Sequence, residues 1–390
     1  MKGSRRSRRA VANMRAGIAG ATRRTWAEVD LDAIAANVRA IRSLLEPRTR
    51  FMAVVKADGY GHGAVQVARA ALSAGAEWLG VATVGEGLAL RRAGIAAPLL
   101  VLGSADPSEI AAAMHAGLSL TIPSIDALPS LLRAGRRVRL HLKVDTGMTR
   151  LGVRPAEVSS VLSRLARAGL RLEGVYTHLA CADDSDHAFT REQLNRFDAV
   201  LPAVRRRFPT VLVHAANSAG ALGHPRARHD LVRVGLAMYG LYPARHFEDK
   251  VELRPVMRLL SRVVRTVRVP PGTPVSYGAT YRPLRPSTIA TVPCGYADGY
   301  PRLAGLNGEI LLGGDRVPVA GRVCMDHLMV DAGDHAVRPG DEVELFGRAV
   351  PVDDVAEWAH TVSYEVVCGV GTRVPRVYLR QGRPVALSVR

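Results

Sequence analysis

Short apolar segments alternate with amphipathic, Ala/Leu/Arg-rich segments from about residue 30 to residue 250. The first amphipathic segment follows Asp30, which suits a helix N-cap, and it has one apolar helical face. That face consists of Leu31, Ile34, Val38, Ile41 and Leu45. Eight apolar runs follow, and most are apolar on both faces, as is typical of strands in a parallel sheet that helices cover. The runs are residues 51–57, 77–83, 98–104, 118–124, 139–145, 171–179, 210–217 and 231–240.

Five of the intervening segments end in the same way, with an Ala-Gly pair just before the next apolar run. Glycine adopts the left-handed conformation after a helix without a Cβ clash, so these pairs predict helix ends. The glycines concerned are Gly75, Gly94, Gly117, Gly135 and Gly169. Eight strands that alternate with helices predict an α/β fold, a TIM-like (β/α)8 barrel, and an open doubly wound sheet is the alternative.

After about residue 255 the pattern changes to Val-rich segments separated by Pro and Gly. Residues 310–319 predict a hairpin around Gly313-Gly314-Asp315, and residues 341–347 predict another strand. We therefore expect a barrel at 26–254 and a C-terminal all-β domain at 255–390. The TWAEVD segment at 25–30 is a candidate for an additional strand of the β domain, and residues 1–25 form a basic extension that we expect to be flexible.

The length and composition of the chain are typical of a globular protein. The chain has 390 residues, of which 48% are hydrophobic, so it can bury a sizeable core. No apolar run reaches the roughly 18 residues that a membrane span requires. The four cysteines lack metal-ligand spacing, which favours free thiols in a reducing compartment, so we expect a cytoplasmic protein. They are Cys181, Cys294, Cys324 and Cys368.

The net charge of +18 raises the question of a nucleic-acid partner. Residues 1–27 contain eight lysines or arginines and no acid, and removing these eight from +18 leaves +10. A DNA-binding arm is one interpretation, but a solvated basic tail is the commoner one. The tail does not resemble a secretory signal, because Arg15 interrupts its apolar stretch.

Lys56 is the first residue that indicates chemistry. It stands at the end of the first apolar run, in AVVKADGYGHG, and in a barrel the carboxyl ends of the strands form the rim where active sites gather. An apolar environment disfavours the charged form of a lysine and makes its amine a nucleophile. A strand-end lysine that points into solvent is the ordinary alternative, and the nearby glycines do not form a dinucleotide-binding fingerprint.

The string around Lys56 closely resembles the cofactor-attachment motif of alanine racemases, barrel-type enzymes that use pyridoxal 5′-phosphate (PLP). The resemblance extends over about residues 25–385 through eight further segments in order. These are KVDTGMTRLG (143–152), THLACAD (177–183), HAANSAG (214–220), RVGLAMYG (233–240), VSYGATY (275–281), CGYADGYPR (294–302), GRVCMDH (321–327) and SYEVVCGVGTRVPR (363–376). The resemblance implies interconversion of L-alanine and D-alanine for peptidoglycan synthesis, by a homodimer that shares its active sites across the interface.

The resemblance also implies two catalytic bases. Racemisation removes a proton from one face of the α-carbon and returns one to the other, so two groups on opposite faces suit the reaction. Lys56 matches the residue that holds PLP and acts as one acid/base, and Tyr277 matches the second base, donated by the partner subunit. His178 matches a hydrogen-bond partner near Tyr277 and the cofactor ring.

Further positions match cofactor contacts. The predicted phosphate site consists of Tyr60, Ser218, Tyr364 and the backbone amides near Gly235 and Leu236, and Asn217, which precedes Ser218, is a further cofactor contact. Most of these follow the seventh and eighth strands, where barrels commonly hold phosphate. Arg233 matches an arginine that faces the pyridine nitrogen. Because arginine only donates and stays charged, it cannot protonate that nitrogen as a carboxylic acid would, and the ring becomes a weaker electron sink.

The remaining matches concern the substrate. Arg150 matches an arginine near the phenolic oxygen of the cofactor and the substrate carboxylate. Tyr296, Met325 and Asp326 match residues at the entry and carboxylate end of the site, reached from the partner subunit. Lys143 matches a lysine that is carbamylated in some relatives, and no residue is expected to bind a metal.

Other functions stay open at this point. A basic-amino-acid decarboxylase with the same two domains places an acid at the pyridine nitrogen and a cysteine near the position of Tyr277, so Arg233 and Tyr277 argue against it. A racemase of broader specificity, for serine or lysine, is harder to exclude because pocket volume decides it. Non-catalytic PLP-binding proteins share the barrel but lack the β domain, so residues 255–390 argue against that class.

Overall fold

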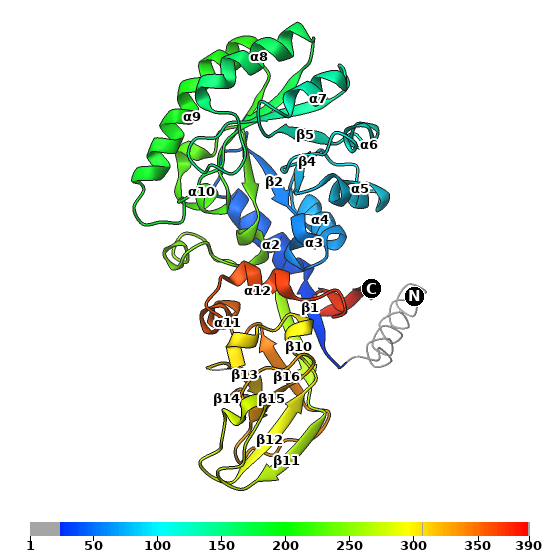
Figure 1. Cartoon of the computed structure of the whole chain (residues 1–390), viewed down its shortest axis with the longest axis vertical. Coiled ribbons are helices and arrows are strands. Elements are labelled where there is room, and N and C mark those ends of the chain that lie inside the picture. The colour runs from blue at the N-terminus through cyan, green and yellow to red at the C-terminus, as the bar shows by residue number, and fades with distance from the viewer. Residues whose placement is uncertain (1–23, 306, 389–390) are drawn as a thin grey trace. The chain divides into compact units, whose positions relative to one another are not determined.

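The computed structural model of the protein describes residues 24–305 and 307–388 (Figure 1). Residues 1–23, which hold most of the expected basic extension, lie outside them. The chain divides into two compact units. The barrel unit comprises Ile34–Gly59 and Ala64–Arg254, and the β unit comprises the described residues up to Ala33, Tyr60–Gly63 and those from Pro255 onward.

Eight parallel strands form the sheet of the barrel unit, in the order β8-β7-β6-β5-β4-β3-β2-β9. Backbone hydrogen bonds from Asp230 to Val213 and from Arg233 to Ala216, both 3.0 Å, bring the two end strands together, so the sheet is a nearly closed barrel. The predicted barrel is confirmed and the open sheet is excluded. The strands are β2 (Arg50–Val54), β3 (Trp78–Val81), β4 (Leu99–Val101), β5 (Ser119–Ile122), β6 (Arg139–Lys143), β7 (Leu172–Tyr176), β8 (Leu212–His214) and β9 (Leu231–Val234).

Both faces of these strands are buried, which explains their continuous apolar sequences. Every residue of β3, β4, β5 and β9 is buried. Met52, Trp78, Leu100 and Leu231, from four strands, form one apolar cluster. Helices pack against the outer face of the sheet, as is typical of parallel sheets.

The helices end where the Ala-Gly pairs predicted. All five glycines have positive φ angles, from 61° at Gly117 to 108° at Gly75. Helix α2 begins after Asp30, whose Oδ1 accepts from the backbone of Asp32 and Ala33, and it ends at Arg42, so Leu45 lies beyond the helix. The helices are α2 (Leu31–Arg42), α3 (Lys56–Tyr60), α4 (Ala64–Ser73), α5 (Val84–Arg92), α6 (Ile110–His115), α7 (Leu128–Arg133), α8 (Val158–Arg167), α9 (Ala188–Arg207) and α10 (Ser218–Gly223).

The β unit contains a seven-stranded sheet, β14-β13-β16-β10-β1-β17-β18, and a three-stranded sheet, β11-β12-β15. The hairpin at Gly313-Gly314, the strand within 341–347 and the strand from the TWAEVD segment are confirmed as β13/β14, β16 and β1. The strands are β1 (Trp26–Asp30), β10 (Met257–Arg262), β11 (Arg265–Val269), β12 (Ser287–Val292), β13 (Glu309–Leu312), β14 (Asp315–Pro318), β15 (Leu328–Asp331), β16 (Glu342–Phe346), β17 (Arg376–Arg380) and β18 (Arg383–Ser388). Two short helices, α11 (Val352–Trp358) and α12 (Ser363–Gly369), were not indicated by the Val-rich pattern.

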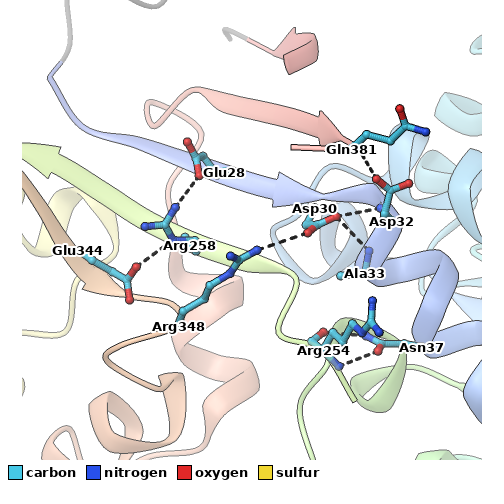
Figure 2. A network of polar contacts seen from close by, with 10 residues as sticks. All are labelled: Glu28, Asp30, Asp32, Ala33, Asn37, Arg254, Arg258, Glu344, Arg348 and Gln381. Carbon is cyan, nitrogen blue, oxygen red and sulfur yellow. Dashed lines mark hydrogen bonds and ion pairs between the residues drawn. The ribbon is translucent and has the colours of Figure 1, made fainter. Parts of the chain in front are cut away.

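Ion pairs fix the N-terminal strand β1 in this sheet (Figure 2). Arg258 on β10 binds Glu28 on β1 at 3.0 Å and Glu344 on β16 at 2.8 Å, so one guanidinium spans three adjacent strands.

Within the barrel unit, the side chain of Asn37 pairs with both backbone groups of Arg254, at 2.8 and 2.9 Å. No helix among the described residues has the length and apolar character needed to cross a membrane.

Candidate active site

Lys56 lies at the carboxyl end of β2 and begins a strained turn. Ala57, Asp58, Gly59 and Tyr60 all have left-handed backbone angles, with φ between 51° and 64°. Such angles cost non-glycine residues about 1–2 kcal/mol each, and strain of this kind clusters at functional sites. Glu86 of α5 accepts a hydrogen bond of 2.7 Å from the backbone of Ala57, so α5 helps to hold the turn that follows Lys56.

A cluster of cations occupies the same rim. Lys143, the last residue of β6, is 5% exposed. Burial and then the positive charge of Arg150 lower the pKa of Lys143 to about 8, and the charges of Arg233 and Lys56 act in the same direction. Asp145 is the one acid that opposes them in this set. The structure therefore brings four of the predicted residues together, in a field that favours an anionic ligand.

Arg233 on β9 is buried and held by several hydrogen bonds. Its Nη1 lies 3.0 Å from Nδ1 of His214, and its Nη2 donates to the carbonyl groups of Thr177 and Ala215 at 2.8 and 2.9 Å. Burial lowers the pKa of Arg233 to about 10, so the side chain is still charged at neutral pH. Within the part of the chain that the structure describes, Nε has no hydrogen-bond partner and remains available as a donor.

His178 follows strand β7 and accepts from Arg233. Its Nδ1 lies 3.3 Å from Nη2 of Arg233, and because arginine only donates, Nδ1 carries the lone pair and Nε2 the proton. Burial, reinforced by the charge of Arg233, holds the pKa of His178 well below its usual range. His178 is therefore a neutral imidazole that presents an N–H donor.

Ser218 and Asn217 form a second polar group on the barrel unit. The hydroxyl oxygen of Ser218 accepts from the backbone amides of Gly235 at 3.1 Å and Ala237 at 3.3 Å. Both lone pairs are then used, so the hydroxyl proton is left for another acceptor. The amide of Asn217 caps α10 and donates to Leu179, which fixes Ser218 at the start of that helix.

Tyr60 and Tyr364 come together in the β unit. Burial, with smaller contributions from Cys368 and Tyr364, raises the pKa of Tyr60, so its hydroxyl stays protonated. A Cβ at Gly61 would lie 2.2 Å from the carbonyl oxygen of Val367, so the Tyr60 loop packs closely on α12. These two predicted phosphate ligands are therefore neighbours.

Tyr277 occupies a strained and exposed turn of the β unit. Its side chain is 71% exposed, and Ser276, Gly278 and Ala279 around it have φ angles of 64°, 76° and 49°. For Ser276, with ψ at −180°, this is a region that essentially only glycine adopts. The Ser276 hydroxyl donates to the carbonyl group of Arg322 at 2.6 Å, which holds the turn against the segment that leads to Met325.

The structure also brings Tyr296, Met325 and Asp326 together. The backbone amide of Tyr296 donates to Cys324 at 3.1 Å, and that of Ala297 donates to Met325 at 3.0 Å. Arg373 joins the two loops, because it binds the buried Asp298 at 2.9 Å and Asp326 at 2.7 Å. Sequence reasoning missed Arg373, although it lies within the matching segment 363–376.

Two further residues of the barrel unit were missed. Tyr176 lies between the cations, with its ring 5.6 Å from Lys143 Nζ and 5.1 Å from the guanidinium of Arg233. Its hydroxyl bonds Thr121 at 2.9 Å, and burial raises its pKa to about 12. His214, the first residue of the HAANSAG segment, stacks on Tyr176 with ring centres 4.7 Å apart. Their positions in buried strands gave no signal of function.

A near-closed barrel with a lysine on its rim, followed by a β unit that presents an exposed tyrosine on a strained turn, defines the barrel-type amino-acid racemases. The family models "Alanine racemase, N-terminal domain" and "Alanine racemase, C-terminal domain" match residues 29–243 and 256–378. The chain belongs to the alanine racemase family.

Individual relatives are similar over nearly their whole length. The alanine racemase of Desulfovibrio desulfuricans is 46% identical over 366 residues, which covers 92% of this chain and 98% of that protein. Alanine racemase 2 of Bacillus subtilis is 41% identical over 386 residues, covering 94% and 97%. Among solved structures, the alanine racemase of Streptomyces coelicolor A3(2) has a TM-score of 0.89 at 39% identity, covering 93% of this chain and all of that one. The Bacillus anthracis enzyme with bound L-Ala-P has a TM-score of 0.88 at 38% identity, covering 94% and 98%.

Proposed function

We propose that this member of the alanine racemase family interconverts L-alanine and D-alanine with PLP held at the rim of the barrel. The observation that carries the proposal is a set of donors on the barrel unit: a lysine on a strained strand end, a charged arginine with a remaining N–H, and a serine with a remaining O–H. When bound, PLP withdraws electrons from the α-carbon and makes its proton acidic. The other steps belong to residues of the chain.

The donor set fits the cofactor. The Ser218 hydroxyl and the backbone around Gly235 and Leu236 would hold its phosphate, together with Tyr60 and Tyr364. Arg233 Nε would donate to the ring nitrogen, and Lys56 would hold the cofactor covalently. The cation cluster on the rim supports both a phosphate and a substrate carboxylate, for which we assign Arg150.

Arg233 favours racemisation over decarboxylation. With a pKa of about 10, its guanidinium stays charged at neutral pH and would donate to the ring nitrogen of a bound cofactor without giving up its proton. Such a donor would leave the ring nitrogen largely unprotonated, so the cofactor would be a weaker electron sink. A carboxylic acid at this position, as in the decarboxylases, would protonate the ring and stabilise charge on the α-carbon for longer.

Two groups would move the α-proton. Lys56 serves one face, and the hydroxyl oxygen of Tyr277 serves the other. A tyrosine hydroxyl is a weak acid, and the N–H that His178 presents would stabilise its deprotonated form. Tyr296, Met325 and Asp326 would line the entry on the same side as Tyr277.

A homodimer would supply Tyr277 from the partner subunit. Every large apolar side chain that is exposed among the described residues belongs to the β unit. They are Tyr277, Leu284, Tyr296, Leu303, Met325, Val362, Tyr364 and Val385. Exposed apolar side chains concentrated in one unit suit an interface, and three of the four residues assigned to the partner are among them. A fully active monomer in sedimentation would contradict this part of the proposal.

Lys143 is proposed to carry a carbamate. With a pKa of about 8, part of its amine is neutral at physiological pH and can attack CO2. The nitrogen forms a bond to the carbon of CO2 and releases one proton, which leaves an anion. That anion would pair with Arg150, whose charge now opposes the ammonium form.

The physiological role that we propose is the supply of D-alanine for peptidoglycan precursors in the cytoplasm. The free state of all four cysteines agrees with a reducing compartment. Serine or lysine racemisation is the second candidate, and the comparison substrates below decide between them.

The first experiment compares wild-type protein with Lys56→Ala and with Lys250→Ala, an exposed lysine in the same unit. We expect wild type and Lys250→Ala to absorb in the cofactor band and to racemise alanine faster than serine or lysine. Lys56→Ala should do neither. A protein that binds PLP but leaves alanine unchanged would move the function to another racemase, a decarboxylase or a PLP carrier.

A further inference from the structure

A row of polar side chains lies inside the barrel behind Arg233. His214 on β8 and His141 on β6 are completely buried, and Glu173 on β7 stands at the end of the row with its side chain 29% exposed. Polar groups in a barrel core cost free energy unless they are paired, so their presence requires an explanation. None of the three residues has a place in the mechanism above.

Hydrogen bonds join Arg233, His214 and His141, and a contact longer than a hydrogen bond of good geometry leads on to Glu173. Arg233 Nη1 lies 3.0 Å from His214 Nδ1, and His214 Nε2 lies 2.9 Å from His141 Nδ1. His141 Nε2 lies 3.4 Å from a carboxylate oxygen of Glu173, and the same oxygen accepts from the hydroxyl of Ser119. We refer to Glu173, His141, His214 and Arg233 as the histidine relay.

The chemistry of the two ends sets the direction of every bond in the relay. Arginine only donates, so His214 Nδ1 accepts and its proton sits on Nε2. That proton is donated to His141 Nδ1, so His141 carries its own proton on Nε2. A carboxylate only accepts when ionised, and Glu173 is the acceptor beside that proton. One tautomer of each histidine is consistent with both ends.

The barrel is shaped around these rings. A Cβ at Gly174, next to Glu173 on β7, would lie 2.1 Å from His141 Nδ1, so only glycine leaves room for the imidazole. Trp78 and His141 pack in a T-shaped pair with ring centres 5.5 Å apart, and Tyr176 stacks on His214 at an interplanar angle of 8°. Neither ring can turn to exchange its nitrogens without moving a strand or an aromatic neighbour.

We propose that Glu173 and His141 are positioning residues that hold the guanidinium of Arg233 toward the cofactor ring by fixing the tautomer of His214. This inference rests on the proposed function. If His141 instead carried its proton on Nδ1, His214 would present an N–H to Arg233. Two donors would then face each other, and the guanidinium would have to turn away. Glu173 prevents this by stabilising the Nε2 proton of His141.

The first test needs neither cofactor nor substrate. Nitrogen NMR of protein with 15N-labelled histidine, prepared without PLP, reports directly which ring nitrogen carries the proton. We expect both His141 and His214 to carry the proton on Nε2 in the wild-type protein. The His141→Gln and His214→Gln variants assign their signals. A proton on Nδ1 of either residue in the wild type would overturn the proposal.

Substitution of Glu173, the residue of the histidine relay farthest from Arg233, tests whether the relay positions Arg233. Glu173→Gln keeps an acceptor oxygen, whereas Glu173→Leu removes it, and Glu192→Leu on the exposed surface of α9 is the control. We expect Glu173→Leu to give mixed tautomers, to bind PLP about tenfold more weakly and to lose kcat with little change in KM. Glu173→Gln and the control should stay near wild type.

The two proposals fail in distinguishable ways. A wild-type protein that binds no PLP contradicts the proposed function. The tautomer measurement still tests the histidine relay, because it is made without PLP. If Glu173→Leu keeps single tautomers and wild-type PLP affinity, the relay has no positioning role, whatever the activity shows. Should Glu173→Leu not fold, the tautomers of wild type and of Glu173→Gln still decide the matter, because both must carry the proton on Nε2.

Discussion

The ammonium nitrogen of Lys143 lies 5.6 Å from the centre of the Tyr176 ring, inside the mouth of the barrel. A cation over an aromatic face gains about 0.5–2 kcal/mol, which would favour the charged lysine. Desolvation and the charge of Arg150 disfavour the charged lysine. These two effects are larger, because the pKa falls from 10.5 to about 8. The protonated form of Lys143 is therefore less favourable in the folded protein than in the unfolded chain, which lowers the free energy of unfolding.

This difference in pKa predicts a specific dependence of stability on pH. Between pH 8 and pH 10.5 the unfolded chain binds a proton at Lys143 that the folded protein does not, so the free energy of unfolding rises with pH across this window. The rise attributable to Lys143 is about 3 kcal/mol. Urea unfolding of wild type and Lys143→Met in CO2-free buffer should show it as a difference that shrinks as pH increases. Lys250→Met, an exposed control, should follow the wild type throughout.

Bicarbonate should change the dependence of stability on pH that Lys143 causes. If Lys143 carries a carbamate, 13C-labelled bicarbonate gives one carbamate carbon signal in the wild type, and Lys143→Arg abolishes it while Lys250→Arg keeps it. The modified protein should also lose its extra sensitivity to low pH, because an anion beside Arg150 is stabilised where an ammonium was not. A wild-type spectrum without this signal at saturating bicarbonate shows that the amine is unmodified.

His178 should be essential for the use of Tyr277 as a base. His178→Phe removes the N–H that the Arg233 contact orients, and we expect kcat to fall by roughly 10²-fold or more. The rate of the variant should also continue to rise at pH values where the wild type has levelled, because the tyrosine loses its stabilising donor. His115→Phe, on the exposed surface of α6, serves as control. An unchanged pH–rate profile in His178→Phe would exclude the assigned role.

Replacing Arg233 by an acid should change the reaction and not only slow it. Arg233→Glu would protonate the ring nitrogen, stabilise charge on the α-carbon for longer and allow transamination to compete. We expect racemisation to fall and pyridoxamine phosphate to accumulate during turnover, measured by absorbance and chromatography. Arg167→Glu on the exposed end of α8 should leave both unchanged. Slower racemisation without any pyridoxamine product would argue that residue 233 does not set the protonation state of the ring nitrogen.

The barrel could be predicted from sequence because its signals are local. Each helix stop at an Ala-Gly pair and each strand apolar on both faces is visible within about ten residues. Helix α12 shows the limit of this approach. Its sequence, Ser363–Gly369, contains adjacent β-branched valines and resembles a strand, so its helical conformation depends on tertiary packing and not on propensity.

The site was predictable only where a motif covered it. Lys56, Arg233 and Tyr277 stand in strings that resemble a family, and the charges of Lys56 and Arg233 both act on Lys143 in the structure. The relay had no such signal. His141 and His214 are 73 residues apart in the chain, and their contact depends on the register of three strands that sequence does not fix. Two histidines in apolar runs are ordinarily satisfied core residues.

Gly174 provides the most direct check that the barrel interior is built around His141. An alanine at this position places its Cβ 2.1 Å from His141 Nδ1, so either the ring or strand β7 must move. Overpacking of this kind costs about 1–3 kcal/mol, and Gly174→Ala should lower the urea midpoint accordingly. Gly85→Ala in α5 is the matched control, because a Cβ at this position would lie 3.9 Å from the Thr83 hydroxyl, which is ordinary contact. Alanine in a helix is also favoured over glycine by up to about 1 kcal/mol. If His141 turns to relieve the clash, its contact with His214 breaks, and PLP affinity should fall with stability. Gly174→Ala with wild-type stability and affinity would mean that the strands yield easily and that the ring is not held.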